Sequence, residues 1–499
     1  EEIKLSNEVT TIGESAFSDC ELLSKIIIPN SVTSIGWSSF SGCTALSTIL
    51  WGNVQTVGSY AFSGCTRLTS LTFGANVATI GDYAFENNTA METVDFVNVT
   101  SIGYAAFQNN TSLTSIDWGN VETVGGNAFY ACTALQYVSF GSQISCVGGY
   151  AFADCTSLAS VFFNYALASL GEYAFTNCTA LSSVSLPAGI SSLSNGVFKG
   201  CTGLQSVVVP SNISLIAYDA FEGCHNLHEV YDLTSHITIT ANSTDNGYVA
   251  YNAVIVHTSR YATHLQTVTT NGFTFKYTGS TEALVKYSGN ATELTLDNIS
   301  TASKTFTDYV IARYAFQEND KIEKLTIGTA VQDIYSEAFS NLSALKQLRF
   351  ENGSDIYLAE NTFLSCGSLD SIIVPTTLNG ISRYAFNNCY NINRLYYEGT
   401  VSSGYSFYPY PTEYTYYSAC EKIHHYGNYW NEKNGVINTT YKDYDREIVQ
   451  ATCTQNGYQL ITCDLCGYRQ NITYTATGHS YSGGVCTDCG HVNNLTVSR

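Results

Sequence analysis

Four cysteines near the C-terminal end of the chain have the spacing of metal ligands. They form two Cys-x-x-Cys pairs, Cys463 with Cys466 and Cys486 with Cys489, and a glycine follows each pair. Each pair presents two thiolates and leaves backbone N–H groups to hydrogen-bond the sulfur atoms, which suits tetrahedral Zn2+. The spacing therefore predicts a zinc site. Disulfide bonds are the alternative, because a secreted protein meets an oxidising environment.

Two aspartates, Asp95 and Asp117, form the second group whose spacing could do chemistry. They stand at the same position of neighbouring sequence repeats. Two carboxylates placed side by side would titrate together or bind a cation. The sequence has no Ser-His-Asp, HExxH or glycine-rich phosphate motif in a suitable context. We therefore predict that the protein is not an enzyme.

A repeat of 22 or 23 residues positions these aspartates. Each unit carries a phenylalanine, a Cys or Asn three residues later, and two aliphatic residues at further steps of three. The phenylalanines are Phe17, Phe40, Phe62, Phe85, Phe107, Phe129, Phe152, Phe175, Phe198 and Phe221. One unit cannot bury its apolar face alone, whereas stacked units can. The period therefore predicts a solenoid of short strands in register, with coils roughly 4.7 to 4.9 Å apart.

Two further positions of the repeat predict local structure. Asn88 and Asn110 replace cysteine in two consecutive units, which argues against disulfides within the column. We expect buried free thiols that, like asparagine, donate to a backbone carbonyl. A glycine follows an inward aliphatic residue in unit after unit, as in Ile35-Gly36. This glycine indicates either a positive φ or a close approach between stacked backbones.

Alternation along each strand predicts which side chains face outward. In the unit of Asp117, Ile116 and Trp118 point into the core, so Asp117 points out. The same rule places Asp95, Tyr137 and Phe162 on the outer face. Exposed aromatic rings beside acids are typical of interfaces, so these four residues are the candidate binding surface. The alternative is a solvated sheet with scattered apolar side chains.

Composition narrows the classes of partner. Lys and Arg number 21 against 41 Asp and Glu, and the net charge of −20 disfavours nucleic acid and anionic lipid. No apolar run approaches the roughly 18 residues of a membrane span, so membrane insertion is not expected. Only 12% of the residues are charged, so the outer surface must consist largely of hydroxyl and aromatic side chains.

Changes in pattern divide the chain into five parts. Residues 1–235 form a first repeat block, and residues 236–308 form a β-hairpin insert with alternating strands and Gly or Asn at the breaks. A second repeat block at 309–400 has a locally basic outer face. A Tyr-rich segment at 401–440 would cap the last coil. The Cys-rich module occupies residues 441–499.

The repeat resembles a known family. The string L-x-x-I-x-x-P-x-x-V-x-x-I-G-x-x-A-F-x-x-C, clearest at 23–43 and 181–201, is similar to BspA-like leucine-rich repeats, and the resemblance covers roughly residues 1–400. It implies a mainly β, right-handed leucine-rich-repeat solenoid of 22–24-residue coils on secreted or cell-surface proteins of host-associated microbes. The C-terminal stretch resembles small zinc-ribbon-like modules of bacterial surface proteins.

This resemblance implies a non-catalytic function. Members of the family are associated with adhesion to extracellular-matrix proteins, to other cells or to glycans, and the repeat positions are not catalytic. We therefore expect an extracellular or cell-surface protein that binds a matrix protein, a host surface protein or a glycan through its strand face. The alternative is a self-associating component of a surface layer or filament. Zinc in the C-terminal module is the one cofactor expected.

Overall fold

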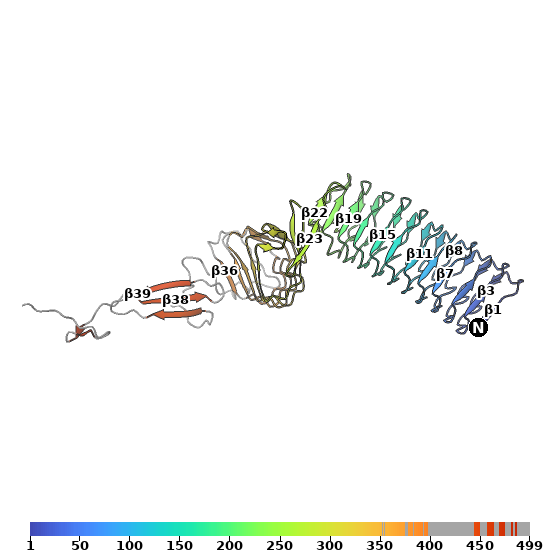
Figure 1. Ribbon diagram of the computed structural model, residues 1–499, viewed down its shortest axis with the longest axis horizontal. Coiled ribbons are helices and arrows are strands. Elements are labelled where there is room, and N and C mark those ends of the chain that lie inside the picture. Colours follow the sequence, from blue (N-terminus) through green and yellow to red (C-terminus); the bar gives the residue numbers. More distant parts are fainter. Residues whose placement is uncertain are drawn as a thin grey trace, which may run out of the picture.

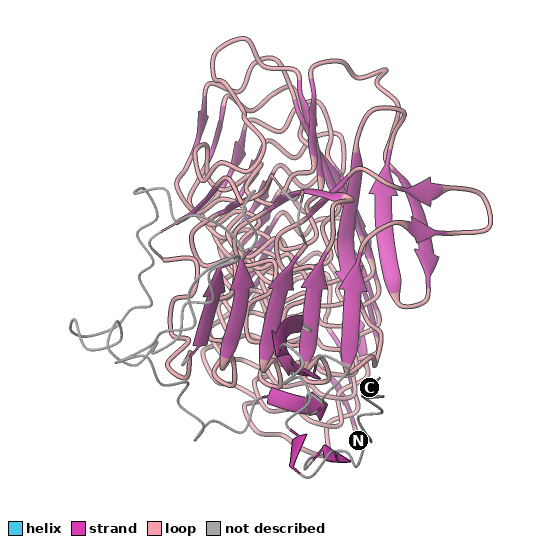
Figure 2. Ribbon diagram, turned by 90° about the vertical axis from the view of Figure 1, so that its left-hand side faces the viewer, coloured by secondary structure: helices cyan, strands magenta, loops and turns pink. Residues whose placement is uncertain are grey.

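The computed structural model describes residues 1–351, 353, 355–374, 378–382 and 384–392, and beyond these the strands at 394–397, 444–449, 457–463, 469–474, 481–482 and 485–486. Within this part of the chain the regular elements are β-strands and none is a helix (Figures 1 and 2). Short parallel strands stack along one long axis, so the prediction of a mainly β solenoid is confirmed.

The longer strand of each coil lies on one side of the first block, and we call the outer surface of these strands the strand face. They are β1 (Glu2–Lys4), β3 (Lys25–Ile27), β5 (Thr48–Leu50), β7 (Ser70–Thr72), β9 (Thr93–Asp95), β11 (Ser115–Asp117), β13 (Tyr137–Ser139), β15 (Ser160–Phe162), β17 (Ser183–Ser185), β19 (Ser206–Val209) and β21 (Glu229–Asp232). Hydrogen-bonded neighbours are parallel, and the same repeat position recurs side by side, as in Ile26 with Ile49.

A shorter strand follows in each coil. These strands are β2 (Thr11–Ile12), β4 (Ser34–Ile35), β6 (Thr56–Val57), β8 (Thr79–Ile80), β10 (Ser101–Ile102), β12 (Thr123–Val124), β14 (Cys146–Val147), β16 (Ser169–Leu170), β18 (Ser192–Leu193) and β20 (Leu215–Ile216). Strands β2 to β16 form one unbroken parallel sheet. The longer strands form separate sheets, with breaks after β5 and after β11. A Trp-Gly-Asn sequence follows the strand at each break, beginning at Trp51 and at Trp118.

The core of the first block is a set of columns, each contributed by one repeat position. Phenylalanine rings of neighbouring coils stack with centroids 5.0 to 5.7 Å apart, from Phe17 to Phe221. Trp118 is buried as expected, and Ile116 is half-buried. Loss of one such ring costs about 3 to 5 kcal/mol in other cores. The repeat therefore specifies the core coil by coil.

The repeated glycine is required by close backbone approach. A Cβ on Gly103 would lie 2.6 Å from the carbonyl carbon of Gly81 in the preceding coil, which leaves no room for a side chain. The alternative, a positive φ at this position, is wrong. The left-handed conformation falls instead on the residue before Ala-Phe, such as Tyr60 (φ 58°) and Tyr83 (φ 56°), and on the residue before the column cysteine.

The stack of parallel strands continues past residue 235. Strand β22 (Ile255–His257) pairs in parallel with β21, and the first core extends to Ala253. The insert then forms three antiparallel strands, β23 (Gln266–Thr270), β24 (Phe273–Tyr277) and β25 (Glu282–Tyr287). A small hairpin of β27 (Ile299–Ser300) and β28 (Thr305–Phe306) follows.

The second block has its own core, one parallel sheet and one mixed sheet. Its strand face consists of β26 (Glu293–Leu296), β30 (Lys324–Ile327), β32 (Gln347–Phe350), β34 (Ser371–Val374) and β36 (Arg394–Tyr397). The other sheet adds β29 (Tyr309–Ile311), β31 (Val331–Ile334), β33 (Tyr357–Leu358) and β35 (Gly380–Ile381) to β25. Beyond residue 440 the described strands are β37 (Tyr444–Val449), β38 (Gly457–Cys463), β39 (Arg469–Tyr474), β40 (Tyr481–Ser482) and β41 (Val485–Cys486).

One buried arginine joins the two blocks. The Arg313 side chain is 3% exposed and lies over the ring of Tyr251, with its guanidinium carbon 3.6 Å from the ring centroid. It donates to the Tyr251 carbonyl (3.2 Å) and hydroxyl (2.9 Å), to the Asn242 amide oxygen (2.5 Å), and to the Ser336 carbonyl (3.2 Å). Arg313 thus links the last part of the first stack to two coils of the second.

Candidate functional site

The four residues of the candidate binding surface lie on four successive strands of the first block. Asp95 and Asp117 are register partners at the ends of β9 and β11. Tyr137 begins β13 and is 54% exposed, and Phe162 ends β15 and is 61% exposed. Phe162 is the register partner of Ser139, so the two rings stand diagonally on adjacent strands. The structure thus places all four on one face, with the interruption of the sheet between Asp117 and Tyr137.

The two aspartates also have a local structural role that the sequence reasoning missed. Asp95 Oδ1 accepts a hydrogen bond from the Val97 N–H (3.0 Å), and Asp117 Oδ1 accepts one from the Gly119 N–H (3.2 Å). Such Asx turns end a strand and turn the chain toward the next corner. Among the described residues no group of three or more His, Cys, Asp or Glu side chains could hold a metal ion. Each aspartate therefore uses Oδ1 to shape the end of its strand. Its Oδ2 is the oxygen that a partner could contact.

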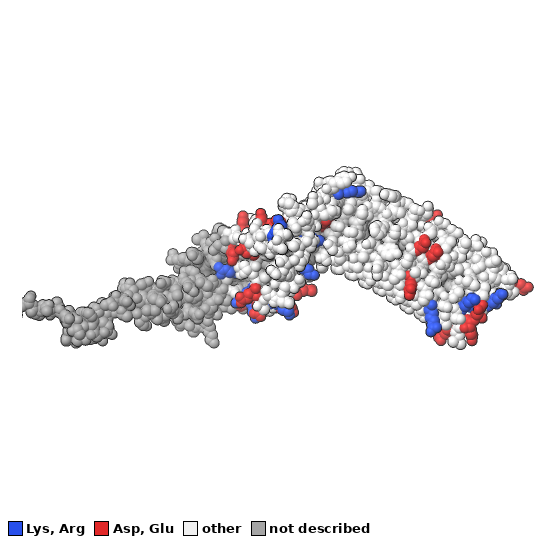
Figure 3. All heavy atoms as spheres, in the orientation of Figure 1, with Lys and Arg blue, Asp and Glu red and all other residues white. Residues whose placement is uncertain are grey.

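The surroundings of these residues are rich in hydroxyl groups and poor in cations. Strands β5 to β19 contain serine and threonine at most outward positions and no Lys or Arg. In Figure 3 the middle of the first block shows acidic but no basic side chains. A partner for this face therefore meets hydrogen-bonding hydroxyls, two carboxylates and two exposed rings.

The strand face of the second block contains a hollow of about 180 Å3 where β26, β30 and β32 lie side by side. Its lining residues are Glu293, Leu294, Thr295, Lys324, Leu325, Thr326, Gln347 and Arg349. Lys324 Nζ lies 2.7 Å from Glu293 Oε1, and both side chains remain more than half exposed. The register places Lys324 beside Gln347 and Thr326 beside Arg349. We call this site the charged hollow.

The exposed face ends just beyond the charged hollow. Ser371 and Ile373 on β34 occupy the same outward positions as Gln347 and Arg349, their register partners. Ser371 is 1% exposed and Ile373 is fully buried, whereas Arg349 is half-buried. The face thus passes from exposed at β26 to closed at β34, and the charged hollow lies at this boundary.

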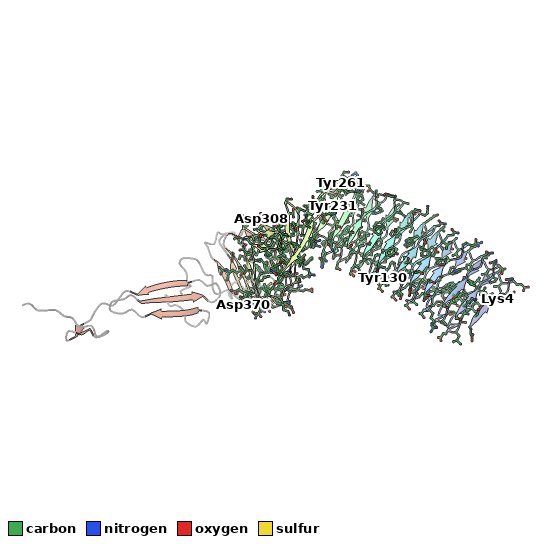
Figure 4. The ribbon with its side chains drawn as sticks, in the orientation of Figure 1. Lys4, Tyr130, Tyr231, Tyr261, Asp308 and Asp370 are labelled. Atoms are coloured by element: carbon green, nitrogen blue, oxygen red, sulfur yellow. The ribbon has the colours of Figure 1, made fainter. Side chains whose placement is uncertain are left out.

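A hydrogen-bonded network, buried except for His264, closes the strand face at the end of the first block. Glu229, on β21, accepts hydrogen bonds from the Tyr231 hydroxyl (2.9 Å) and the Leu265 N–H (3.0 Å). Its oxygens also lie 3.0 Å from His257 Nε2 and 3.4 Å from His264 Nδ1. We call these five residues the Glu229 clasp; Figure 4 labels Tyr231 at this end of the block.

The clasp keeps its carboxyl group ionised. Burial alone raises the pKa of Glu229, but the hydrogen bonds from His257, Leu265, Tyr231 and His264 together lower it below its ordinary value. The clasp could not be predicted from the repeat pattern, because His257 and His264 lie outside the repeat. Of the five residues, the repeat period predicts the positions of Glu229 and Tyr231 alone, and both are outward positions of β21.

The cysteines of the column are buried free thiols that are unsuited to act as nucleophiles. The eleven cysteines from Cys20 to Cys389 whose side chains the structure describes are all free, and in the column only Cys20 is more than slightly exposed. Cys43 Sγ donates to the Phe17 carbonyl (3.0 Å), and Asn110 Nδ2 makes the corresponding bond to Phe85 (2.9 Å), as predicted. Burial raises the pKa of the Cys43 thiol to about 11 and that of Cys132 to about 12. Thiols that stay protonated are poor nucleophiles.

The predicted zinc ligands are only partly within the described part of the chain. Cys463 ends β38 and Cys486 ends β41, where the structure describes the strands alone. Cys466 and Cys489 lie outside the described residues, as does the Tyr-rich segment 401–440. The zinc site therefore stays a prediction.

Comparison with protein families gives one match that covers most of the chain. The model described as "BspA type Leucine rich repeat region" matches in six copies, at residues 1–114, 100–228 and 294–430. No significant match was found among curated proteins. Within the described residues there is no helix with the length and apolar character of a membrane span.

Comparison with solved structures gives several matches at low sequence identity. A leucine-rich repeat protein from Bacteroides ovatus is 21% identical, with a TM-score of 0.45, over 79% of this chain and 86% of that one. A leucine-rich cell surface protein from Faecalibacterium prausnitzii is 19% identical, with a TM-score of 0.35, over 66% and 88% of the two chains. An internalin from Listeria monocytogenes is 15% identical, with a TM-score of 0.22, over 81% and 86%.

Proposed function

The chain belongs to the family of proteins with BspA-type leucine-rich repeats, and from this we propose that it is a non-catalytic adhesion or binding protein of the extracellular space or cell surface. Its partner is a matrix protein, a host surface protein or a glycan, and the contact is made by the strand face of the first block. A repeat scaffold suits this role, because each coil presents the same outward positions and the coils together form an extended surface.

The observation that carries the proposal is the exposure of Tyr137 and Phe162 on that face. Aromatic side chains are enriched among the residues that dominate binding energy, and here both rings are more than half exposed. The phenylalanine of the repeat, by contrast, is buried in every coil from Phe40 to Phe221. Packing of the solenoid therefore does not account for the rings of Tyr137 and Phe162.

The test is the double substitution Tyr137→Ser and Phe162→Ser in the full chain. We expect at least a 30-fold loss of affinity for the physiological partner, since truncation of a central aromatic contact costs about 2 kcal/mol or more. Binding is measured against arrays of matrix proteins, mucins and glycans, with light scattering on the same samples. Tyr261→Ser is the matched control, because Tyr261 is 94% exposed on a loop of the insert.

Unchanged binding by the double variant would exclude this face as the adhesion surface. If the unsubstituted protein binds nothing on the arrays but grows in mass with concentration, the self-associating surface component is the correct class. The circular dichroism of the variant should match that of the parent, because both substituted side chains lie outside the core.

A further inference from the structure

We propose that a row of aromatic rings at one corner of the first block binds an extended, basic protein segment, whose lysine or arginine side chains lie against the exposed rings. The rings come from four successive coils, and we call them the aromatic row: Trp37, Tyr60, Tyr83 and Tyr104. This surface is separate from the strand face and goes beyond the function proposed above. Three observations support it: the arrangement of the rings, the charge around them, and the spacing of the exposed rings.

The aromatic row lies at the corner between the shorter strand of each coil and its core phenylalanine. The Tyr60 and Tyr83 rings stack, with centroids 4.6 Å apart and planes at 9°. Trp37 and Tyr104 flank this pair, with their planes turned by 65° and 67° against their neighbours. Trp37 is 49% exposed and Tyr104 is 44% exposed, whereas the two middle rings are half-buried. The row therefore presents one exposed ring at each end.

The requirements of the fold do not account for the exposed end rings. Neither Trp37 nor Tyr104 belongs to the hydrophobic core of the block. The left-handed residue that follows each of them is not aromatic, since it is Ser38 in one coil and Ala105 in the other. One coil after Tyr104 the corner contains Gly126 and Asn127 instead, so the corner forms without aromatic rings.

The charge beside the aromatic row is negative. Asp82 Oδ1 accepts a hydrogen bond from the Tyr104 N–H (2.8 Å), so this carboxylate lies next to the row. Burial, then the neighbouring tyrosines and the Glu86 carboxylate, raise the pKa of Tyr83, which places Glu86 beside the row as well. Between the first and the last ring the sequence holds one Lys or Arg, Arg67, in the turn before β7. Charge complementarity thus favours a cationic ligand.

The combination of exposed rings and carboxylates selects lysine and arginine side chains. An ammonium or guanidinium group is attracted to the face of a Trp or Tyr ring, and nearby carboxylates add to that attraction. The protein already contains one such contact, because the Arg313 guanidinium carbon lies 3.6 Å from the centroid of the Tyr251 ring. A basic side chain of a partner would make the same contact at each end of the aromatic row.

The spacing of the end rings specifies the segment. Trp37 and Tyr104 both follow the repeated glycine, so they hold the same position in coils that are three steps apart. Three steps between stacked strands correspond to roughly 14 Å. In an extended chain, residues four positions apart are separated by roughly the same distance, and their side chains point to the same side. The fitting segment therefore carries two basic residues four positions apart.

The test compares two peptides of identical composition. Each contains two arginines among glycines and serines; the arginines are four positions apart in the first peptide and adjacent in the second. Fluorescence anisotropy measures binding of the labelled peptides to the full chain at low salt. We expect the first peptide to bind at least three-fold more tightly, because adjacent side chains of an extended chain point to opposite sides. A third peptide with glutamate in place of arginine should not bind.

Substitution locates the site. Trp37→Ser with Tyr104→Ser should weaken binding of the first peptide at least five-fold and remove its advantage over the second, since each exposed cation–π contact contributes a factor of about two to five. Asp82→Asn should weaken binding at least two-fold, because it removes the charge but keeps an acceptor for the Tyr104 N–H. The matched controls are Tyr165→Ser, at a ring that is 96% exposed, and Glu122→Gln, at an exposed acid. Each should change affinity by less than two-fold.

Four results would overturn the proposal. These are equal affinity for the two arginine peptides, full binding by a double variant whose circular dichroism matches that of the parent, an equal loss in Glu122→Gln and Asp82→Asn, and no binding of the first peptide at millimolar concentration. Asp82→Asn keeps both rings, so it tests the site even if the double variant does not fold. The Tyr137→Ser, Phe162→Ser variant should bind the peptide as the parent does, which separates this surface from the strand face.

Discussion

At the scale of the residue, the interior column of cysteine and asparagine explains how one position accepts two side chains. The Cys43 thiol donates to one carbonyl of the preceding coil, whereas Asn110 Nδ2 donates to two carbonyls, that of Phe85 in the preceding coil (2.9 Å) and that of Phe107 in its own coil (2.7 Å). Both side chains are small and fully enclosed. The position thus requires a compact side chain, which usually donates to a neighbouring carbonyl, although Asn88 donates to none and Leu342 has no donor.

This burial predicts which thiols react. In the folded protein at pH 7.5 we expect a small alkylating reagent to label Cys20 and Cys146, which are half-buried, well before the enclosed cysteines of the column. The reason is that attack requires an accessible thiolate, and burial raises the pKa of thiols such as Cys43 and Cys132. Peptide mass spectrometry measures labelling at each site. Rapid labelling of Cys132 in the native protein would contradict the enclosed column.

The same experiment decides the state of the C-terminal cysteines. If Cys463, Cys466, Cys486 and Cys489 hold Zn2+, as we propose, they become reactive when a chelator is added without reductant. If they form disulfides, only a reductant exposes them. Labelling at the rate of Cys146 in the absence of both reagents would exclude both states.

At the scale of the element, the Glu229 clasp ties the start of the insert to the strand face. The hydrogen bonds to Glu229 come from β21, from β22 and from the segment that leads into β23. Because its folded pKa lies below the ordinary value of 4.5, ionised Glu229 stabilises the fold at every pH above that value. This contribution disappears as the pH falls through the lowered pKa.

We therefore expect Glu229→Gln to lower the free energy of unfolding at pH 7 by about 1 to 3 kcal/mol, the cost of losing hydrogen bonds to a buried charge. The difference from the parent should shrink as the pH falls below 4.5. Thermal unfolding across pH measures this, and hydrogen exchange at the Leu265 amide reports the segment itself. Glu122→Gln, at an exposed residue, is the control. A difference that stays constant down to pH 3 would show that ionisation of Glu229 is not the cause.

At the scale of the whole molecule, Arg313 links the two blocks, together with a small apolar cluster of Val254, Ala283, Val285 and Ala312. The first core ends at Ala253, and the second begins with Phe273. Between them, the Arg313 guanidinium contacts Asn242 and Tyr251 on one side and Ser336 on the other. Burial lowers the pKa of Arg313, yet the group remains charged at neutral pH, and its planar shape uses several donors at once.

Removal of this side chain should uncouple the blocks. For Arg313→Ala we expect calorimetric unfolding to separate into two transitions. The free energy that stabilises the junction should fall by about 3 to 5 kcal/mol, as when one partner of a buried ion pair is removed. Arg67→Ala, at an exposed residue of the first block, should unfold as the parent does. A single transition at the parent temperature would show that other contacts hold the blocks together.

Periodicity explains which features the sequence could predict. The phenylalanine and cysteine columns and the outward positions of Asp95, Asp117, Tyr137 and Phe162 follow from a fixed step of 22 or 23 residues. Contacts made by non-repeating residues could not be foreseen. The charged hollow combines Lys324 and Arg349 of the repeat with Glu293, whose strand lies before the repeat block that the sequence predicts at 309–400. The junction joins Arg313 to residues 62 and 71 positions away.

The two alternatives for the repeated glycine stayed open for a similar reason. The sequence shows that a residue without a side chain is needed at Gly103, but not whether the backbone angle or a neighbouring coil demands it. The left-handed residues were hidden because the chain uses tyrosine there in several coils, as at Tyr60 and Tyr83, instead of glycine. Their rings stack 4.6 Å apart, which helps to offset the cost of the conformation.

The hydrogen bonds between coils run along the long axis of the solenoid, as in the bond from the Phe40 N–H to the Ala61 carbonyl (2.8 Å). When the two ends are pulled apart, the bonds of one coil therefore break at a time, rather than those of all the coils together. Each coil that detaches frees 22 or 23 residues, or about 75 Å of extended chain. A protein that holds a cell to a surface under flow would in this way lengthen in steps and absorb mechanical work before its contact breaks.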